Sequence, residues 1–226
     1  MLSGLKASLT ESASRCRTLY DRKRFRQGKL FVVSAPSGAG KTTLCSKLLE
    51  NNKALRYSIS YTTRKPRFDE AHAADYFFVD VPEFRRMIDE GEFIEWAEVH
   101  GNYYGTSRRT VEGIIDEGGD VLLDIDPQGA RQLKATLGYG VYIFITAPSI
   151  KELEKRLRNR RTEPEDVMRL RLDNARKELR LFSEYDYIIM NRDFEEAYKH
   201  LESVYIAEHL RTKDVRDIYE LMEEEE

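Results

Sequence analysis

The sequence is poor in cysteine, proline and glycine, and it has no long apolar run. Two cysteines among 226 residues, Cys16 and Cys45, supply neither a disulfide framework nor a zinc cluster, and they favour a reducing compartment. Thirteen glycines and six prolines exclude collagen-like and Pro/Gly-rich disordered chains. The longest apolar run, Val141–Ile145, is far shorter than the roughly 20 residues that a membrane-spanning helix needs. We therefore expect a cytoplasmic protein with no membrane partner.

The remaining composition is that of a soluble globular protein. Hydrophobic residues make up 41% of the chain and charged residues 34%, which is enough apolar surface for a real core. A length of 226 residues suits one α/β domain that carries insertions better than two domains.

The charge is distributed unevenly along the chain. Residues 1–29 hold eight basic and two acidic side chains, a balance of +6, so the rest of the chain carries −9. A nucleic-acid-binding domain would carry a basic face on its folded part, and this pattern therefore predicts no nucleic-acid partner. Arginines in local clusters favour a small phosphorylated ligand instead. The Ser/Arg-rich segment 1–28 is interpreted as a basic extension, and a weak resemblance to an organelle transit peptide leaves targeting open.

From residue 30 onward, short apolar strands alternate with amphipathic helices. Two capping boxes, at Asp80–Glu83 and Ser149–Glu152, mark helix starts. Strands that alternate with helices predict a parallel sheet with helices on both faces. The predicted strands of this sheet are Leu30–Val33, Val121–Ile125, Val141–Ile145 and Tyr187–Met190, and the predicted helices begin near Lys41, Ser149 and Phe194.

Two segments fit this core poorly. The segment 58–105 is rich in aromatic and charged residues, and its stretches YFFV and FIEWAEV predict a small inserted sheet. The segment 156–171 is almost continuously charged, and a solvated helix face is the usual reason for such a run.

A glycine-rich loop follows the first predicted strand. It reads APSGAGKTT and contains G-K-T, with alanine where the phosphate-loop pattern has its first glycine, so it lacks only that glycine. Glycines let consecutive N–H groups point at phosphate oxygens, and the following helix aims its positive end at the same place. Lys41 can reach the terminal phosphates, and Thr42 can offer a hydroxyl to Mg²⁺. The predicted ATP-binding residues of the loop are Ala35, Pro36, Ser37, Gly38, Ala39, Gly40, Lys41, Thr42 and Thr43.

Two acids end the strand VLLDID. Asp124 and Asp126 should lie at the carboxyl edge of the sheet, where ligands bind in open α/β folds. They could cap the following helix, but beside a phosphate loop a role in holding Mg²⁺ or a second substrate is favoured.

The chain resembles guanylate kinases in several motifs that occur in the family's order. These are SISYTTRKPR, DYFFV, FIEWAEVHGNYYGTS and VLLDIDPQGA, together with the phosphate loop, the arginine-rich segment and YDYIIMN. The resemblance implies an α/β P-loop fold with a parallel central sheet, a small mixed GMP-binding insertion and a helical lid. It also implies the domain limits: a kinase-like domain over 29–226, with its core at 29–57, 108–155 and 172–215, the insertion at 58–107 and the lid at 156–171.

The resemblance further implies transfer of the γ-phosphate of ATP to GMP, with Mg²⁺ as cofactor. It assigns the metal to Thr42 and Asp124, and an ATP contact to Asn191. Guanidinium groups suit a phosphate dianion, and carboxylates suit guanine, because guanine offers donors where adenine offers a bare acceptor and no amine. The implied GMP-binding residues are Ser60, Arg64, Arg67, Tyr76, Glu95, Tyr104, Thr106 and Asp126, and the implied catalytic residues are Lys41, Arg64, Arg156, Arg160 and Arg171.

Some positions depart from the family pattern. The chain has Phe68–Asp69–Glu70 and then Ala73–Ala74, where the family usually has Pro-Gly-Glu and then a glycine. It has Asn159–Arg160–Arg161 in place of Gly-Arg-Gly. Arg192 follows Asn191, where the family often has an acid. Three alternatives stay open: a kinase-like binding module without catalysis, a kinase for another nucleoside monophosphate, and an NTPase without an acceptor. The sequence leaves the choice between monomer and homo-oligomer undecided.

Overall fold

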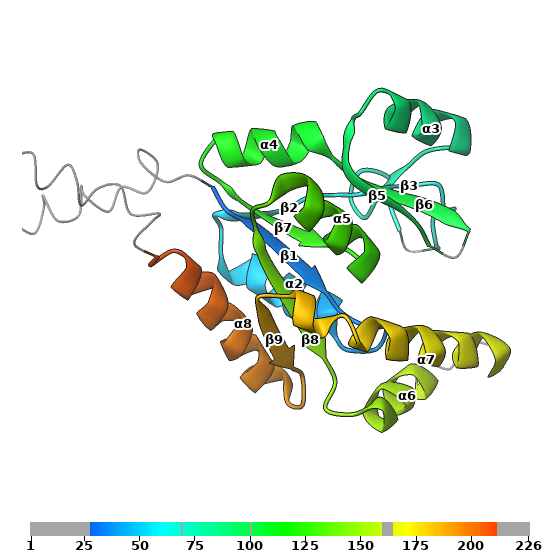
Figure 1. Ribbon diagram of the computed structural model, residues 1–226, viewed down its shortest axis with the longest axis vertical. Helices are drawn as coiled ribbons and strands as arrows, with labels where there is room; N and C mark the ends of the chain where they lie inside the picture. The colour runs from blue at the N-terminus through cyan, green and yellow to red at the C-terminus, as the bar shows by residue number, and fades with distance from the viewer. Residues whose placement is uncertain (1–27, 69, 100, 160–164, 212–226) are drawn as a thin grey trace, which may run out of the picture.

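The central sheet of the protein consists of five parallel strands. The computed structural model describes residues 28–211 apart from 69, 100 and 160–164. The strand order places β1 in the middle, which confirms the predicted parallel sheet (Figure 1). The sequence did not predict β2, the shortest strand of this sheet. In spatial order the strands are β2 (Leu55–Tyr57), β7 (Asp120–Asp124), β1 (Leu30–Ser34), β8 (Val141–Thr146) and β9 (Tyr187–Met190).

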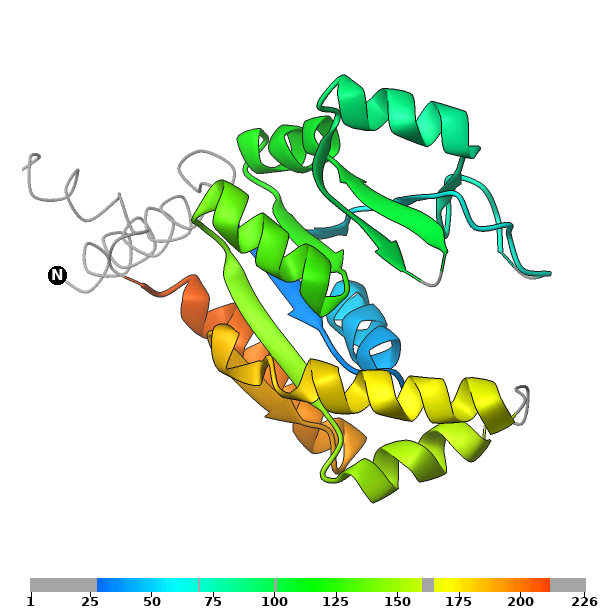
Figure 2. The same ribbon diagram turned by 45° about the vertical axis from the view of Figure 1, so that its right-hand side comes forward.

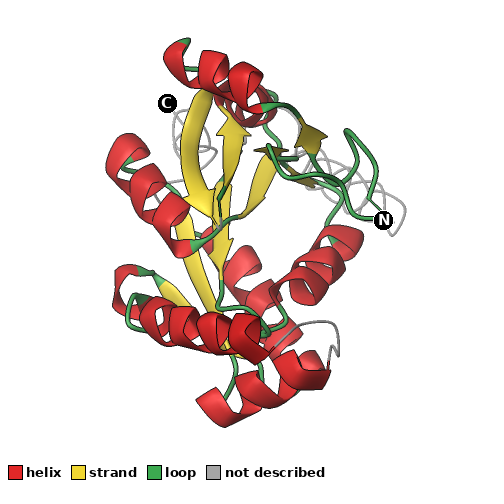
Figure 3. Cartoon of the chain, turned by 90° about the vertical axis from the view of Figure 1, so that its right-hand side faces the viewer, coloured by secondary structure: helices red, strands yellow, loops and turns green. Residues whose placement is uncertain are grey.

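Helices cover both faces of this sheet (Figure 3). Side chains alternate along β1, so Phe31 and Val33 enter one core cluster, whereas Leu30 and Val32 enter the other. Both faces are apolar because both are covered, which is why the strands read as continuous apolar runs. On the first face lie α2 (Lys41–Asn51) and α8 (Phe194–Glu208), and on the second lie α4 (Arg108–Asp116) and α5 (Pro127–Leu137).

The second sheet lies wholly within the inserted segment and is mixed. Its strand order is β4-β3-β6-β5, with β3 parallel to β4 and antiparallel to β6. A small core of Phe84, Met87 and Phe93 packs between this sheet and α3. Only Phe77 and Phe78 of the predicted strand YFFV form a strand. The elements are β3 (Tyr61–Thr62), β4 (Phe77–Phe78), α3 (Val81–Asp89), β5 (Phe93–Val99) and β6 (Asn102–Ser107).

Both predicted capping boxes supply a helix N-cap. The backbone N–H of Glu83 donates to Asp80 Oδ1 at 2.8 Å, and that of Glu152 donates to Ser149 Oγ at 3.1 Å. The first caps α3, and the second stands at the start of α6 (Ile150–Asn159).

The arginine-rich segment contributes to two helices rather than one. Helix α6 ends at Asn159 and α7 spans Glu165–Leu179; they pack through Leu157, Met168 and Leu172. Arg160, which the resemblance implies to be catalytic, lies outside the described residues. The α6–α7 pair and the second sheet stand on either side of the central sheet (Figure 2). Within the described ranges, no helix is both long and apolar enough to cross a bilayer.

A fully buried carboxylate joins the amino end of the sheet to α8. Asp120 is 0% exposed, and it accepts hydrogen bonds from the Lys29 backbone N–H at 3.0 Å and from the Tyr205 hydroxyl at 2.7 Å. The imidazole Nε2 of His209 lies 3.1 Å from Asp120 Oδ2. A buried polar group is tolerated only when it is satisfied in this way.

Replacement of this carboxylate should therefore destabilise the whole fold. We expect Asp120→Ala to lower the free energy of unfolding by about 2–4 kcal/mol, because it removes the buried carboxylate that accepts hydrogen bonds from the Lys29 N–H and the Tyr205 hydroxyl. Urea denaturation measures the change. The control is Asp116→Ala, an exposed side chain on α4, which should change the same quantity by less than about 0.5 kcal/mol. Equal effects of the two variants would show that Asp120 does not join these elements.

Candidate active site

The glycine-rich loop connects β1 to α2 and takes the backbone shape that its glycines predict. Gly38 and Gly40 have φ values of +86° and +91°, which side chains disfavour. No side chain caps α2, so the first N–H groups of the helix are not used by a cap. Asn191, which directly follows β9, is bound to the loop: its Nδ2 donates to the Ala39 carbonyl oxygen at 2.8 Å. The arrangement suits an anion.

Lys41, the first residue of α2, is bound to the carboxyl end of β7. Its Nζ forms an ion pair with Asp124 and donates to the Ile125 carbonyl oxygen at 3.2 Å. Burial lowers the pKa of this lysine, but the carboxylate of Asp124 more than offsets the effect, so the pKa is raised above its ordinary value. Lys41 therefore carries its charge beside the loop.

The two acids at the carboxyl end of β7, Asp124 and Asp126, have different partners. Asp126 is the N-cap of α5, and its Oδ1 accepts the Gly129 backbone N–H at 2.9 Å. The helix-cap alternative is thus correct for Asp126, while Asp124 pairs with Lys41 instead.

A second buried carboxylate lies near Asp126. Glu95 on β5 is only 5% exposed, and the Thr106 hydroxyl donates to its Oε1 at 2.5 Å. Burial raises the pKa of Glu95 to about 7; the Thr106 hydrogen bond opposes this rise, and the charge of Asp126 adds to it. A Cβ at Gly129 would come within 2.6 Å of Glu95 Oε2, so only glycine leaves room there. Ser60 is buried just before β3, whose partner β6 carries Thr106.

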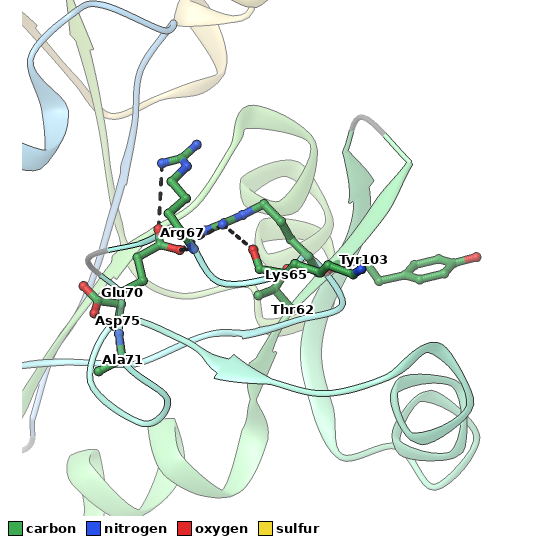
Figure 4. A network of polar contacts seen from close by, with 8 residues as sticks. Thr62, Lys65, Arg67, Glu70, Ala71, Asp75 and Tyr103 are labelled. Atoms are coloured by element: carbon green, nitrogen blue, oxygen red, sulfur yellow. Dashed lines mark hydrogen bonds and ion pairs between the residues drawn. The ribbon is translucent and has the colours of Figure 1, made fainter. Parts of the chain in front are cut away.

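Two arginines of the insertion, Arg64 and Arg67, contact Glu70, a residue that the sequence did not predict as part of a site (Figure 4). The guanidinium of Arg64 donates two hydrogen bonds to the Glu70 carboxylate, each of 2.9 Å. The Arg67 backbone N–H adds a third at 2.8 Å, while the Arg67 guanidinium is exposed, 3.8 Å from the same carboxylate. These contacts, led by that of Arg64, lower the pKa of Glu70.

Two tyrosines complete this cluster. The Arg64 guanidinium lies 5.4 Å from the ring centre of Tyr76, whose ring is 6.1 Å from that of Tyr104. Burial, and then the charge of Asp124, raise the pKa of Tyr76. Tyr76 thus lies within electrostatic reach of Asp124 at the carboxyl end of β7.

Arginines from both helices of the α6–α7 pair contact the phosphate loop or Asn191, which is bound to that loop. Arg156 donates to the Asn191 carbonyl oxygen at 3.0 Å and to Glu152 at 2.9 Å. Arg171 on α7 contacts Ser37 Oγ at 3.5 Å. Arg156, Arg171 and Asn191 therefore lie beside the loop that leads into Lys41.

The comparisons agree with this geometry. A family model described as "Guanylate kinase" matches residues 27–208. The chain belongs to the guanylate kinase family. A guanylate kinase of Geobacter metallireducens is 54% identical over 83% of this chain and 92% of its own length. One of Geobacter sulfurreducens is 54% identical over 85% and 95%, respectively. The crystal structure of guanylate kinase from Anaplasma phagocytophilum has a TM-score of 0.74 and 38% identity, covering 88% of this chain and 95% of that one.

Membership of the guanylate kinase family confirms the expected fold class and the expected kind of enzyme, a kinase. One departure from the family pattern, at Ala73, can now be compared with the backbone of the structure. Ala73 stands where the guanylate kinase pattern usually has glycine, and it keeps a φ of +64°, a conformation that favours glycine. Ala73 thus takes a backbone conformation that glycine favours, although it carries a side chain.

The loop geometry generates a stability prediction. Gly40→Ala should destabilise the fold in two ways: it places an L side chain at positive φ, and its Cβ would collide with the Asn191 amide. We expect a loss of about 2–3 kcal/mol in the free energy of unfolding, measured by urea denaturation.

The matched control is Gly91→Ala. Gly91 has a φ of +68° with nothing within 4 Å of an added Cβ, so it carries only the backbone penalty of about 1 kcal/mol. Losses of equal size at the two positions would refute the close packing of Asn191 against the loop.

Proposed function

We propose that the chain transfers the γ-phosphate of ATP to GMP, the reaction of the guanylate kinase family, with the residue roles given below. The observation that carries the proposal is a juxtaposition. A phosphate loop with a charged lysine stands at the carboxyl end of β7, and a second cluster of a buried carboxylate, arginines and tyrosines lies beside it. One cluster suits a triphosphate and the other a purine monophosphate.

Guanine recognition is assigned to Glu95 and Asp126, with help from Ser60 and Thr106. Guanine N1–H and its exocyclic amine donate hydrogen bonds, so both carboxylates would find partners. Adenine would leave a buried acid unpaired, and a site built to accept hydrogen bonds rejects such an analogue by roughly 10⁴-fold or more. Thr106 fixes the Glu95 carboxylate through its hydrogen bond.

The phosphate of GMP is assigned to Arg64 and Arg67, with the hydroxyls of Tyr76 and Tyr104. Glu70 holds Arg64 in a two-point ion pair before any anion arrives. The guanidinium has further donors, so it can bind phosphate oxygens while Glu70 keeps its plane fixed.

The triphosphate is assigned to the loop and the lid. Backbone N–H groups of the loop would bind its oxygens, Lys41 would follow the γ-phosphate, and Arg156, Arg160 and Arg171 would neutralise the transferred group. Phosphoryl transfer needs such alignment and charge neutralisation more than covalent help from the protein. Asn191 fixes the Ala39 carbonyl of the loop and is assigned a contact with adenine.

Thr42 and Asp124 are the residues that would hold Mg²⁺. Their donor set fits, since the hydroxyl and carboxylate oxygens that they offer are what Mg²⁺ takes, and phosphates supply the remaining ligands. Within the described ranges, no group of three His, Cys, Asp or Glu side chains forms a metal site by itself. When bound, the ion would neutralise part of the charge on the phosphates. A cytoplasmic location stays part of the proposal, supported by the buried free thiol of Cys45.

Release of ADP tests the function. ADP is measured with ATP and Mg²⁺ plus GMP, AMP, UMP or dTMP, and without an acceptor. We expect rapid release with GMP and release at least about 10³-fold slower in every other case. Equal release without an acceptor would show an NTPase, and a preference for another monophosphate would contradict the assignment of the purine site.

The buried carboxylate makes GMP affinity dependent on pH. The pKa of Glu95 is about 7 in the free protein, whereas guanine binds only the ionised form. Below pH 7 the affinity for GMP should therefore fall, by up to about tenfold per pH unit. Titration calorimetry between pH 5.5 and 8 measures it.

The phosphate of GMP itself titrates near pH 6 and adds a pH dependence that is the same for every variant. Glu95→Gln is therefore the matched control. The variant should bind GMP more weakly, discriminate less against AMP, and lose the part of the pH dependence due to Glu95. Identical pH profiles for the two proteins would contradict the role of Glu95.

A further inference from the structure

Glu178, one residue before the end of α7, carries a carboxylate that the proposed function does not use. The side chain is half-buried, and it has no hydrogen bond or ion pair to any residue in the described part of the chain. Asp173 on the same helix is exposed and pairs with Arg176 at 2.8 Å. An unpaired, half-buried carboxylate is costly, and a ligand that donates hydrogen bonds to it would recover that cost.

The face of α7 that carries Glu178 also carries Arg171. The two residues are seven apart, which is about two helical turns, so their side chains lie on the same side of the helix about 10 Å apart along its axis. Arg171 contacts Ser37 of the phosphate loop at 3.5 Å. This face is therefore the one directed at the proposed site.

The segment that follows α7 is bound to α5, on the acceptor side of the site. The chain continues into a short 3-10 helix, η1 (Phe182–Glu184), where Glu184 accepts a hydrogen bond from Arg131 Nε at 2.8 Å. Lys134 donates to the Glu184 carbonyl oxygen at 2.7 Å. Both basic residues belong to α5, whose cap is Asp126.

The charges that act on Glu178 agree with this placement. Burial raises the pKa of Glu178, the charge of Asp126 raises it further, and Lys41 lowers it. Glu178 thus lies within electrostatic reach of both the acid assigned to guanine and the lysine assigned to the transferred phosphate.

We propose that Glu178 binds the ribose of GMP, with its carboxylate accepting hydrogen bonds from the 2′- and 3′-hydroxyls. This inference rests on the proposed function, which puts guanine at Asp126 and the monophosphate toward Lys41, with the ribose between them. Guanine's donors already have Glu95 and Asp126, and a phosphate would repel a carboxylate. The two ribose hydroxyls are the donors of GMP that still need acceptors.

A double-mutant cycle between protein and substrate tests the proposal. The value of kcat/KM is measured for GMP, 2′-deoxyGMP and 3′-deoxyGMP with the wild type, Glu178→Ala and Glu178→Gln. The wild type should prefer GMP over at least one deoxy analogue by about tenfold or more, as a hydrogen bond to a charged group predicts. In Glu178→Ala this preference should fall below about twofold. Glu178→Gln keeps a neutral acceptor and should lie between them.

Asp173→Ala on the same helix is the control, and it should leave the preference unchanged. Equal losses for all three substrates in the Glu178 variants would assign Glu178 a structural or lid-positioning role and overturn the proposal. Unchanged preference in those variants would overturn it too. If the wild type forms no ADP with GMP at all, the proposed function itself fails, which is a distinct result.

Discussion

The site depends on the ion pair between Lys41 and Asp124. Strands β1 and β7 pair in parallel, with Val33 opposite Asp124, so both strands end at one edge of the sheet. The loop after β1 turns directly into α2, which begins at Lys41. Burial alone would favour a neutral lysine, and the neighbouring carboxylate reverses that preference. The protein thereby keeps a charged ammonium group next to a helix N-terminus, where phosphate oxygens would bind.

Two arginines of the site are paired in a similar way. Arg64 is bound by Glu70 and Arg156 by Glu152, so each guanidinium has a fixed orientation before an anion is present. Glu95 differs, because burial holds it near the midpoint of its titration around neutral pH. This division follows the chemistry of the proposed substrates: phosphates need oriented cations, and guanine needs an ionised acceptor in a dry pocket.

Much of the fold could be predicted from the sequence because its signals are local. The buried strands are continuous apolar runs, and both capping boxes place a side-chain acceptor at a helix start. Strand β2 was missed because only Leu55 of its three residues is buried. Glu70 was missed because its contact with Arg64 depends on how the loop between them turns back, and Glu178 because its surroundings come from distant segments.

The central claim is that Lys41 acts on the transferred phosphate and takes no part in binding the acceptor. Kinetics of Lys41→Ala with GMP, together with titration calorimetry of the variant with GMP, test it most directly. The account predicts a fall in kcat of at least about 10²-fold with GMP affinity changed less than about twofold. Retention of wild-type kcat, or a loss of GMP affinity as large as the loss of kcat, would contradict it.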